Sequence, residues 1–143
     1  MKVLIGADHG GFELKEKIKK HLCEKAIDVK DYGTHSADSC DYNDIALSVS
    51  EAIVKGEADR GILVCGTGVG MAIQANKVEG IRAALVHDMF TAKATREHND
   101  SNVLTMGGRI IGDELANAIV DIWLETPFSK EDRHQRRVDK LNR

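Results

Sequence analysis

Short apolar runs alternate with longer amphipathic segments along almost the whole chain. Four runs are short and mostly apolar, as is typical of strands in a buried parallel sheet: 2–6, 61–65, 81–86 and 102–106. Residues 28–32, ended by Gly33, form a weaker fifth strand, the second along the chain. Between and after them, apolar side chains recur every three or four residues, which is the helical period. That period predicts helices at about 10–26, 42–55, 71–77, 89–97 and 112–124.

This alternation of five strands with five helices predicts a doubly wound α/β fold, Rossmann- or flavodoxin-like, in one domain over residues 1–143. We expect a five-stranded parallel sheet in the order 2-1-3-4-5, covered by helices on both faces. Ligands of such sheets bind outside the carboxyl ends of the strands, where the strand order reverses. In this order the first and third strands are neighbours at that point.

A further helix, at about 130–141, is too polar to complete the core. Arg133 and Arg137 share one of its faces by their i, i+4 spacing, and like charges at that spacing destabilise a helix. A charged run of this kind is most often a solvated face. Here the surplus charge favours an anionic partner instead.

The segment 65–71, Cys-Gly-Thr-Gly-Val-Gly-Met, stands between the third strand and its helix. Glycines at alternate positions let backbone N–H groups approach a ligand closely, and the positive end of the helix suits an anion or a developing oxyanion. The positive electrostatic potential at this end of the helix also favours the thiolate form of Cys65. The spacing is neither the dinucleotide fingerprint nor a P-loop. From the loop alone, a structural turn with a buried cysteine explains it equally well.

Other strand ends carry polar groups as well. The first strand ends in Asp8 and His9, the fourth in His87 and Asp88, and the fifth in Gly107, Gly108 and Arg109. Alone, a histidine there is more often structural, and an aspartate can simply cap the next helix. Gathered with a cysteine at the one edge where ligands bind, they indicate a site.

Composition narrows the function classes. A net charge of −3 and a pI near 6.1 give no support to nucleic-acid or membrane-surface binding. Cysteines 23, 40 and 65 are an odd number without metal-type spacing, which favours a reducing compartment. With no secretory pattern at the start of the sequence, we expect a cytoplasmic protein.

The chain resembles the ribose-5-phosphate isomerase B family, whose wider group includes galactose-6-phosphate isomerase subunits. The matching segments run in order along nearly the whole chain: 6–11, 31–34, 41–42, 65–70, 75–77, 80–82, 96–100, 108–109, and 133–134 with Arg137. Two positions depart from the family pattern. Asn43 stands where the family usually has proline, and Glu131-Asp132 replaces the usual Gly-Gly.

The resemblance implies an aldose–ketose isomerase that interconverts ribose 5-phosphate and ribulose 5-phosphate, a reaction of the pentose phosphate pathway, through an enediolate. It assigns Cys65 as the base at C2, Thr67 as a hydroxyl that handles the transferred proton, and His98 as the residue that opens the sugar ring. We expect the turn carrying His98 to face the ligand edge. The backbone of the loop would hold the enediolate oxygen, through Gly66, Gly68, Val69 and Gly70.

The resemblance also implies substrate contacts, no metal and no cofactor. Asp8 and Asn99 match sugar-hydroxyl contacts, Tyr42 belongs to a matching segment beside the ligand, and the phosphate side would be formed by His9, Arg109, Arg133 and Arg137. The family forms homodimers with sites shared between subunits, so the polar C-terminal helix is expected to reach a neighbour's crevice. Two such dimers could also associate into a tetramer, a dimer of dimers. Two alternatives remain open: an isomerase of a hexose 6-phosphate such as galactose or allose 6-phosphate, and a non-catalytic phosphate- or nucleotide-binding module.

Overall fold

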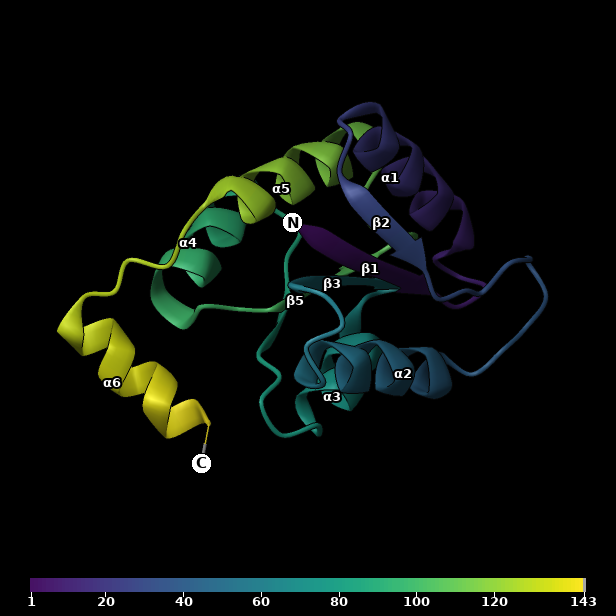
Figure 1. Cartoon of the computed structure of the whole chain (residues 1–143). Helices are drawn as coiled ribbons and strands as arrows, with labels where there is room; N and C mark the ends of the chain where they lie inside the picture. Colours follow the sequence, from purple (N-terminus) through teal and green to yellow (C-terminus); the bar gives the residue numbers. More distant parts are fainter. Residues whose placement is uncertain (143) are drawn as a thin grey trace.

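A five-stranded, all-parallel sheet lies between two layers of helices in the computed structural model, which describes residues 1–142 (Figure 1). The strands are β1 (Lys2–Ala7), β2 (Asp28–Asp31), β3 (Arg60–Cys65), β4 (Ala83–Leu85) and β5 (Val103–Gly107). The helices are α1 (Phe12–Glu24), α2 (Tyr42–Val54), α3 (Val69–Asn76), α4 (Met89–Asn99), α5 (Asp113–Glu125) and α6 (Asp132–Leu141). The predicted α/β class and the predicted elements are confirmed, with ends shifted by a few residues.

The strand order differs from the prediction at one edge. It is β2-β1-β3-β5-β4, so the expected order 2-1-3-4-5 is wrong for its last two strands. All five residues of β5 are buried, whereas β4 has three residues that are half-buried or exposed. The five-residue β5 takes the inner position, where helices cover both of its faces, and the three-residue β4 forms the edge.

The predicted neighbours at the switch point are confirmed. β1 pairs with β3 in parallel, and Ala7 lies opposite Val64. Asp8, the residue after β1, and Cys65, the last residue of β3, therefore lie at the ends of adjacent strands. The expected ligand edge, where these strands end, is formed as the sequence predicts.

Each face of the sheet has its own core. On one face α1, α4 and α5 cover a cluster that includes Ile18, Leu22 and Trp123, all fully buried. On the other face α2 and α3 cover Val49 and Met71, also fully buried. The sheet is thus sealed on both sides, which leaves its edges for chemistry.

Helix α6 lies outside these two layers. It packs against α4, and Figure 1 shows it at the far side of the molecule from the end toward which the arrows of β1 and β2 point. Its buried side chains are those of His134 and Val138. In the described part of the chain, no helix combines the length and apolar character needed to cross a bilayer.

Candidate active site

The loop after β3 cradles the side chain of Cys65. The residue is 4% exposed, and the backbone N–H of Gly68 donates to Sγ at 3.0 Å. Gly68 has φ +81°, a left-handed conformation that turns the chain directly into α3. Sulfur therefore lies at the N-terminal end of a helix, with an N–H aimed at it, which stabilises negative charge on that atom.

Two other glycines of the loop permit close approach by neighbouring side chains. A Cβ on Gly66 would lie 2.9 Å from the Arg109 guanidinium, and one on Gly70 would lie 2.7 Å from the Tyr42 ring. Arg109 and Tyr42 thus border the loop that follows Cys65. Thr67 is exposed beside them, and its Oγ1 accepts the N–H of Val69 at 3.3 Å.

Asp8 and His9 lie at the end of the adjacent strand. One oxygen of the buried Asp8 carboxylate, Oδ1, accepts the N–H groups of Gly10 and Gly11 at 2.9 and 3.2 Å. This carboxylate therefore does cap the turn into α1, while its second oxygen stays out of those bonds. His9 accepts the Cys40 N–H at Nδ1 at 3.3 Å, which leaves its Nε2–H as a donor in the neutral ring.

His87 supports this edge in a way that its sequence position did not reveal. Its Nε2 accepts the N–H of Gly107 at 2.9 Å, and the next residues donate to the loop: Gly108 N–H to Cys65 O at 2.8 Å and Arg109 N–H to Gly66 O at 3.1 Å. Burial lowers the pKa of His87, although Asp88 acts in the opposite direction. A neutral ring keeps the acceptor lone pair that this contact needs.

The structure separates His98 from this edge. The expectation that its turn faces the ligand edge is wrong for a single chain, because α4 continues to Asn99 and carries His98 back toward the start of β5. At about 3.3 Å per residue, the five residues of β5 place this end of α4 on the order of 15 Å from the carboxyl edge. Within one chain, His98 and Cys65 therefore lie at opposite edges of the sheet.

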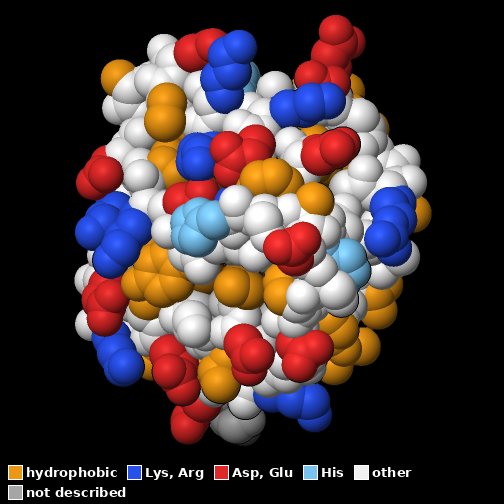
Figure 2. Space-filling view, turned by 90° about the vertical axis from the view of Figure 1, so that its right-hand side faces the viewer, with side chains coloured by type: hydrophobic (Ala, Val, Ile, Leu, Met, Phe, Trp, Pro, Cys, Tyr) orange, Lys and Arg blue, Asp and Glu red, His pale blue; other side chains and the backbone are white. Residues whose placement is uncertain are grey.

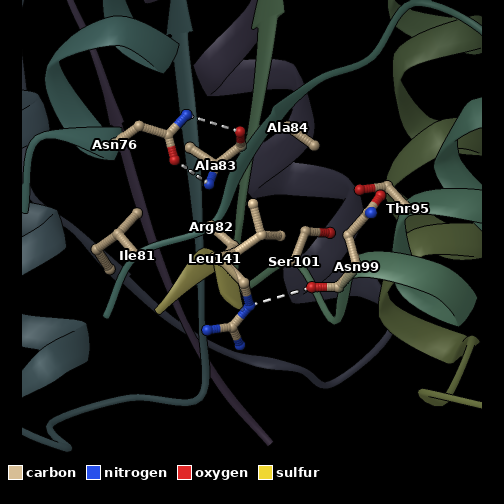
Figure 3. A pocket seen from close by; sticks show the side chains of 9 residues that line it. All are labelled: Asn76, Ile81, Arg82, Ala83, Ala84, Thr95, Asn99, Ser101 and Leu141. Carbon is tan, nitrogen blue, oxygen red and sulfur yellow. Dashed lines mark hydrogen bonds between the residues drawn. The ribbon is translucent and has the colours of Figure 1, made fainter. Parts of the chain in front are cut away.

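Arg82, which directly precedes β4, holds this end of α4 in place. Its Nε donates to the backbone oxygen of Asn99 at 3.0 Å, as Figure 3 shows, and its NH2 group donates to Asp100 O at 2.9 Å. A positive charge beside the last carbonyl groups of a helix stabilises the helix, because those groups carry partial negative charge. Asn99 also lines a cavity of about 380 Å³ between α3, β4, α4 and α6 (Figure 3).

A second cavity gathers the remaining predicted residues at this amino edge. It measures about 410 Å³ and is lined by His98, Asn99, Arg133, His134 and Arg137. Arg133 pairs with Glu131 at 3.0 Å. Two guanidinium groups beside an imidazole and an amide form a surface that suits a phosphorylated, hydroxylated ligand.

His134 is a residue of this cavity to which sequence reasoning gave no role. It is 5% exposed, and its ring centroid lies 4.5 Å from that of His98. Burial lowers the pKa of His134, and nearby His98 and Arg133 lower it further. Its position one residue after Arg133 in the first turn of α6 was the available signal.

The predicted site residues therefore form two groups. The carboxyl-edge group is Asp8, His9, Tyr42, Cys65, Gly66, Thr67, Gly68, Val69, Gly70 and Arg109; the amino-edge group is His98, Asn99, Arg133 and Arg137. Figure 2 looks onto the carboxyl edge and shows histidine side chains beside patches of hydrophobic ones, with charges of both signs around them. Among residues 1–142, no three His, Cys, Asp or Glu side chains are arranged to hold a metal ion.

Comparisons with known proteins agree with this architecture. A sequence profile described as Ribose/Galactose Isomerase matches residues 3–141. Ribose-5-phosphate isomerase B of Escherichia coli is 47% identical over 140 residues, covering 98% of this chain and 93% of its own length. D-erythrulose-4-phosphate isomerase 2 of Mycolicibacterium smegmatis is 39% identical over 144 residues, covering 99% and 95%. The structure of Clostridium thermocellum ribose-5-phosphate isomerase B aligns with a TM-score of 0.97 at 49% identity, covering 99% and 95%.

Proposed function

This chain belongs to the ribose/galactose isomerase family, a family of sugar-phosphate isomerases, and we propose that it interconverts ribose 5-phosphate and ribulose 5-phosphate with Cys65 as the base. The observation that carries the proposal is the contact between Cys65 Sγ and the Gly68 N–H at the start of α3. A thiol held in this way, beside a loop whose backbone N–H groups can bind an anion, suits proton transfer to and from carbon. The proposed reaction uses neither a metal nor an organic cofactor.

In the proposed reaction, Cys65 acts as a thiolate that removes the proton from C2 of the open-chain aldose. The electron pair moves to the carbonyl oxygen and gives an enediolate, whose charge the N–H groups of the loop 66–70 would stabilise. Thr67 would move a proton between the two substrate oxygens. Return of the proton from sulfur to C1 completes the ketose, so no atom is gained or lost.

Ring opening must come first, because ribose 5-phosphate exists mainly as a furanose. His98 would donate a proton to the ring oxygen while solvent takes up the proton of the C1 hydroxyl, a general acid role that histidine commonly fills. Arg133 and Arg137 would bind the phosphate dianion. Phosphate does not react, yet its binding energy would hold C1 and C2 against the thiol.

These roles require groups that lie at opposite edges of one chain, so we propose a site composed of two copies. The carboxyl-edge group of one copy would meet the amino-edge group of its partner. In a two-fold dimer the arrangement is repeated, which gives two equal sites.

An apolar surface at the carboxyl edge supports a partner there. Val69, Ile73, Leu85, Met89 and Phe90 are 46, 58, 39, 50 and 82% exposed. Leu85 lies directly against the start of α3, since a Cβ on Gly68 would be 2.6 Å from its side chain. Covering these side chains would stabilise association at about 25 cal/mol per Å² of apolar surface buried. The same contact would close the crevice around Cys65 to water.

The purified protein should be assayed with ribose 5-phosphate, allose 6-phosphate, galactose 6-phosphate and erythrose 4-phosphate, with and without EDTA. We expect the highest kcat/KM with ribose 5-phosphate and no loss in EDTA. A preference for a hexose phosphate or for the four-carbon sugar would support the proposed isomerase activity but show that ribose 5-phosphate is not its main substrate. Absence of ketose formation from every sugar would leave a phosphate-binding module and refute the proposal.

A further inference from the structure

His134 is held by hydrogen bonds on both sides of its ring. Its Nδ1 lies 2.6 Å from Ser129 Oγ, and its Nε2 accepts the Nε–H of Arg133 at 3.4 Å. The backbone N–H of Ser129 donates to Glu97 O at 3.2 Å, which ties the serine to the residue before His98. These contacts connect the first turn of α6 with the last turn of α4.

The hydrogen-bond pattern determines the tautomer of His134. An arginine Nε–H is always a donor, so Nε2 must offer its lone pair. A neutral imidazole carries one N–H, which therefore lies on Nδ1 and donates to Ser129 Oγ. Protonation would place a hydrogen on Nε2 facing the Arg133 N–H, so the contact favours a neutral ring.

The neutral ring lies against His98. The two centroids are 4.5 Å apart at an interplanar angle of 36°, while His98 itself is exposed to the cavity. An exposed histidine can occupy several rotamers, and a buried aromatic neighbour at this distance restricts them. His134, which packs against His98 through its ring, also accepts the hydrogen bond from Arg133 at Nε2.

We propose that His134 is a positioning residue that fixes the ring of His98 for opening the sugar and orients Arg133 toward the phosphate. This inference rests on the proposed function. It assigns His134 no proton transfer and no contact with the reacting atoms. Its effect on ring opening passes through the ring face, and its effect on the phosphate passes through Nε2.

Two variants separate these effects. His134→Phe keeps a ring against His98 and loses both hydrogen bonds, whereas His134→Asn keeps a donor for Ser129 and loses the ring. The substrates are ribose 5-phosphate and erythrose 4-phosphate, which cannot close a furanose ring because its 4-oxygen is esterified. Steady-state kinetics on both substrates give a ratio that reports ring opening.

We expect His134→Asn to lower kcat on ribose 5-phosphate by about tenfold more than on erythrose 4-phosphate. His134→Phe should keep the ratio of the two kcat values within about threefold of the wild-type ratio while raising KM for both sugars. Equal losses in His134→Asn on the two sugars, or none, would overturn the proposal, because a merely structural role acts on both alike.

A double variant tests whether His134 acts through His98. In a His98→Asn background, His134→Asn should cause no further selective loss on the furanose; a further loss would assign it an independent role. If His134→Asn does not fold, Ser129→Ala removes the partner of His134 Nδ1 at a half-buried position instead. For Ser129→Ala we expect kcat to fall about threefold more on ribose 5-phosphate than on erythrose 4-phosphate. An equal loss on the two sugars would overturn the proposal. A wild-type protein inactive on both sugars would refute the proposed function itself.

Discussion

The Sγ atom of Cys65 accepts a hydrogen bond from the backbone N–H of Gly68 at 3.0 Å. The donor precedes the first turn of α3, so the helix and the N–H act on sulfur from the same side. A buried thiol in an apolar core would have no such donor. This contact distinguishes Cys65 from Cys23, which is exposed on α1, and from Cys40 in the loop before α2.

Cys65→Ala should abolish isomerisation and leave phosphosugar affinity within a few-fold, because in the proposed reaction the thiolate acts on C2 and adds little binding of the ground state. Turnover and calorimetric binding measure the two effects separately. Cys23→Ala and Cys40→Ala are the matched controls and should stay active. A Cys65→Ala enzyme within about tenfold of wild type, a barrier change of about 1.4 kcal/mol, would remove Cys65 from its role.

Gly70→Ala should raise KM by about tenfold, because its Cβ would lie 2.7 Å from the Tyr42 ring and push that ring out of place. Folding should be unaffected, since alanine is favoured over glycine within a helix. In a Tyr42→Ala background the same change should have little effect on KM. If KM rises equally in both backgrounds, the ring does not transmit the effect.

His98→Asn should slow turnover of ribose 5-phosphate and spare an open-chain aldose phosphate, because only the cyclic form needs ring opening. Parallel assays with ribose 5-phosphate and erythrose 4-phosphate measure this difference. Equal losses on the two sugars would instead assign His98 to the proton transfer between C2 and C1.

Acid should destabilise the fold through Asp31. Burial raises the pKa of its carboxyl, but hydrogen bonds from Lys19, from the fully buried Lys15 and from the Gly33 N–H more than offset this and lower it to about 2. A lowered pKa in the folded state contributes stability above the ordinary value of 3.8, and this contribution is lost as pH falls from about 4 to about 2. It amounts to about 1–2 kcal/mol after screening by solvent.

Denaturant unfolding from pH 7 to pH 2 tests this contribution. Asp31→Asn should cost about 2–4 kcal/mol at pH 7, because it leaves the Lys15 ammonium without its main partner, and it should flatten the acid limb. Asp28→Asn, an exposed position on the same strand, is the control and should change stability by less than about 0.5 kcal/mol. An unchanged acid limb in Asp31→Asn would contradict the assignment.

The sequence predicted the parts of the fold that depend on periodicity. Leu14, Ile18 and Leu22 recur at the helical period within the helix predicted at 10–26 and are buried, and β1 lies beside β3. The order of β4 and β5 was not predictable in this way, since both are short apolar runs. Their places follow from burial on two faces, which depends on the helices that cover them.

The candidate site was predictable where one strand end carries it. The alternating glycines after Cys65 identify this loop in the sequence. The location of His98 follows from the order of the predicted elements, because it lies between a helix and the following parallel strand. That connection is at the amino edge of the sheet whether the helix ends at Glu97 or at Asn99. The support at His87 depends on its contact with Gly107, and that at His134 on its contact with the ring of His98. Both contacts join separate segments of the chain, so sequence position alone does not reveal them.

The most direct test of the two-copy site is complementation in a purified heterodimer. One copy carries Cys65→Ala and the other His98→Ala with Arg137→Ala, each homodimer being inactive, and two affinity tags isolate the mixed species. Both lesions then fall in one site and the other site is intact, so activity should return to about half of wild type. As a control, Cys65→Ala paired with Arg109→Ala should stay inactive, because the lesions lie in the same group and damage one site each. An inactive Cys65→Ala and His98→Ala/Arg137→Ala heterodimer would contradict the account and place each site within a single chain.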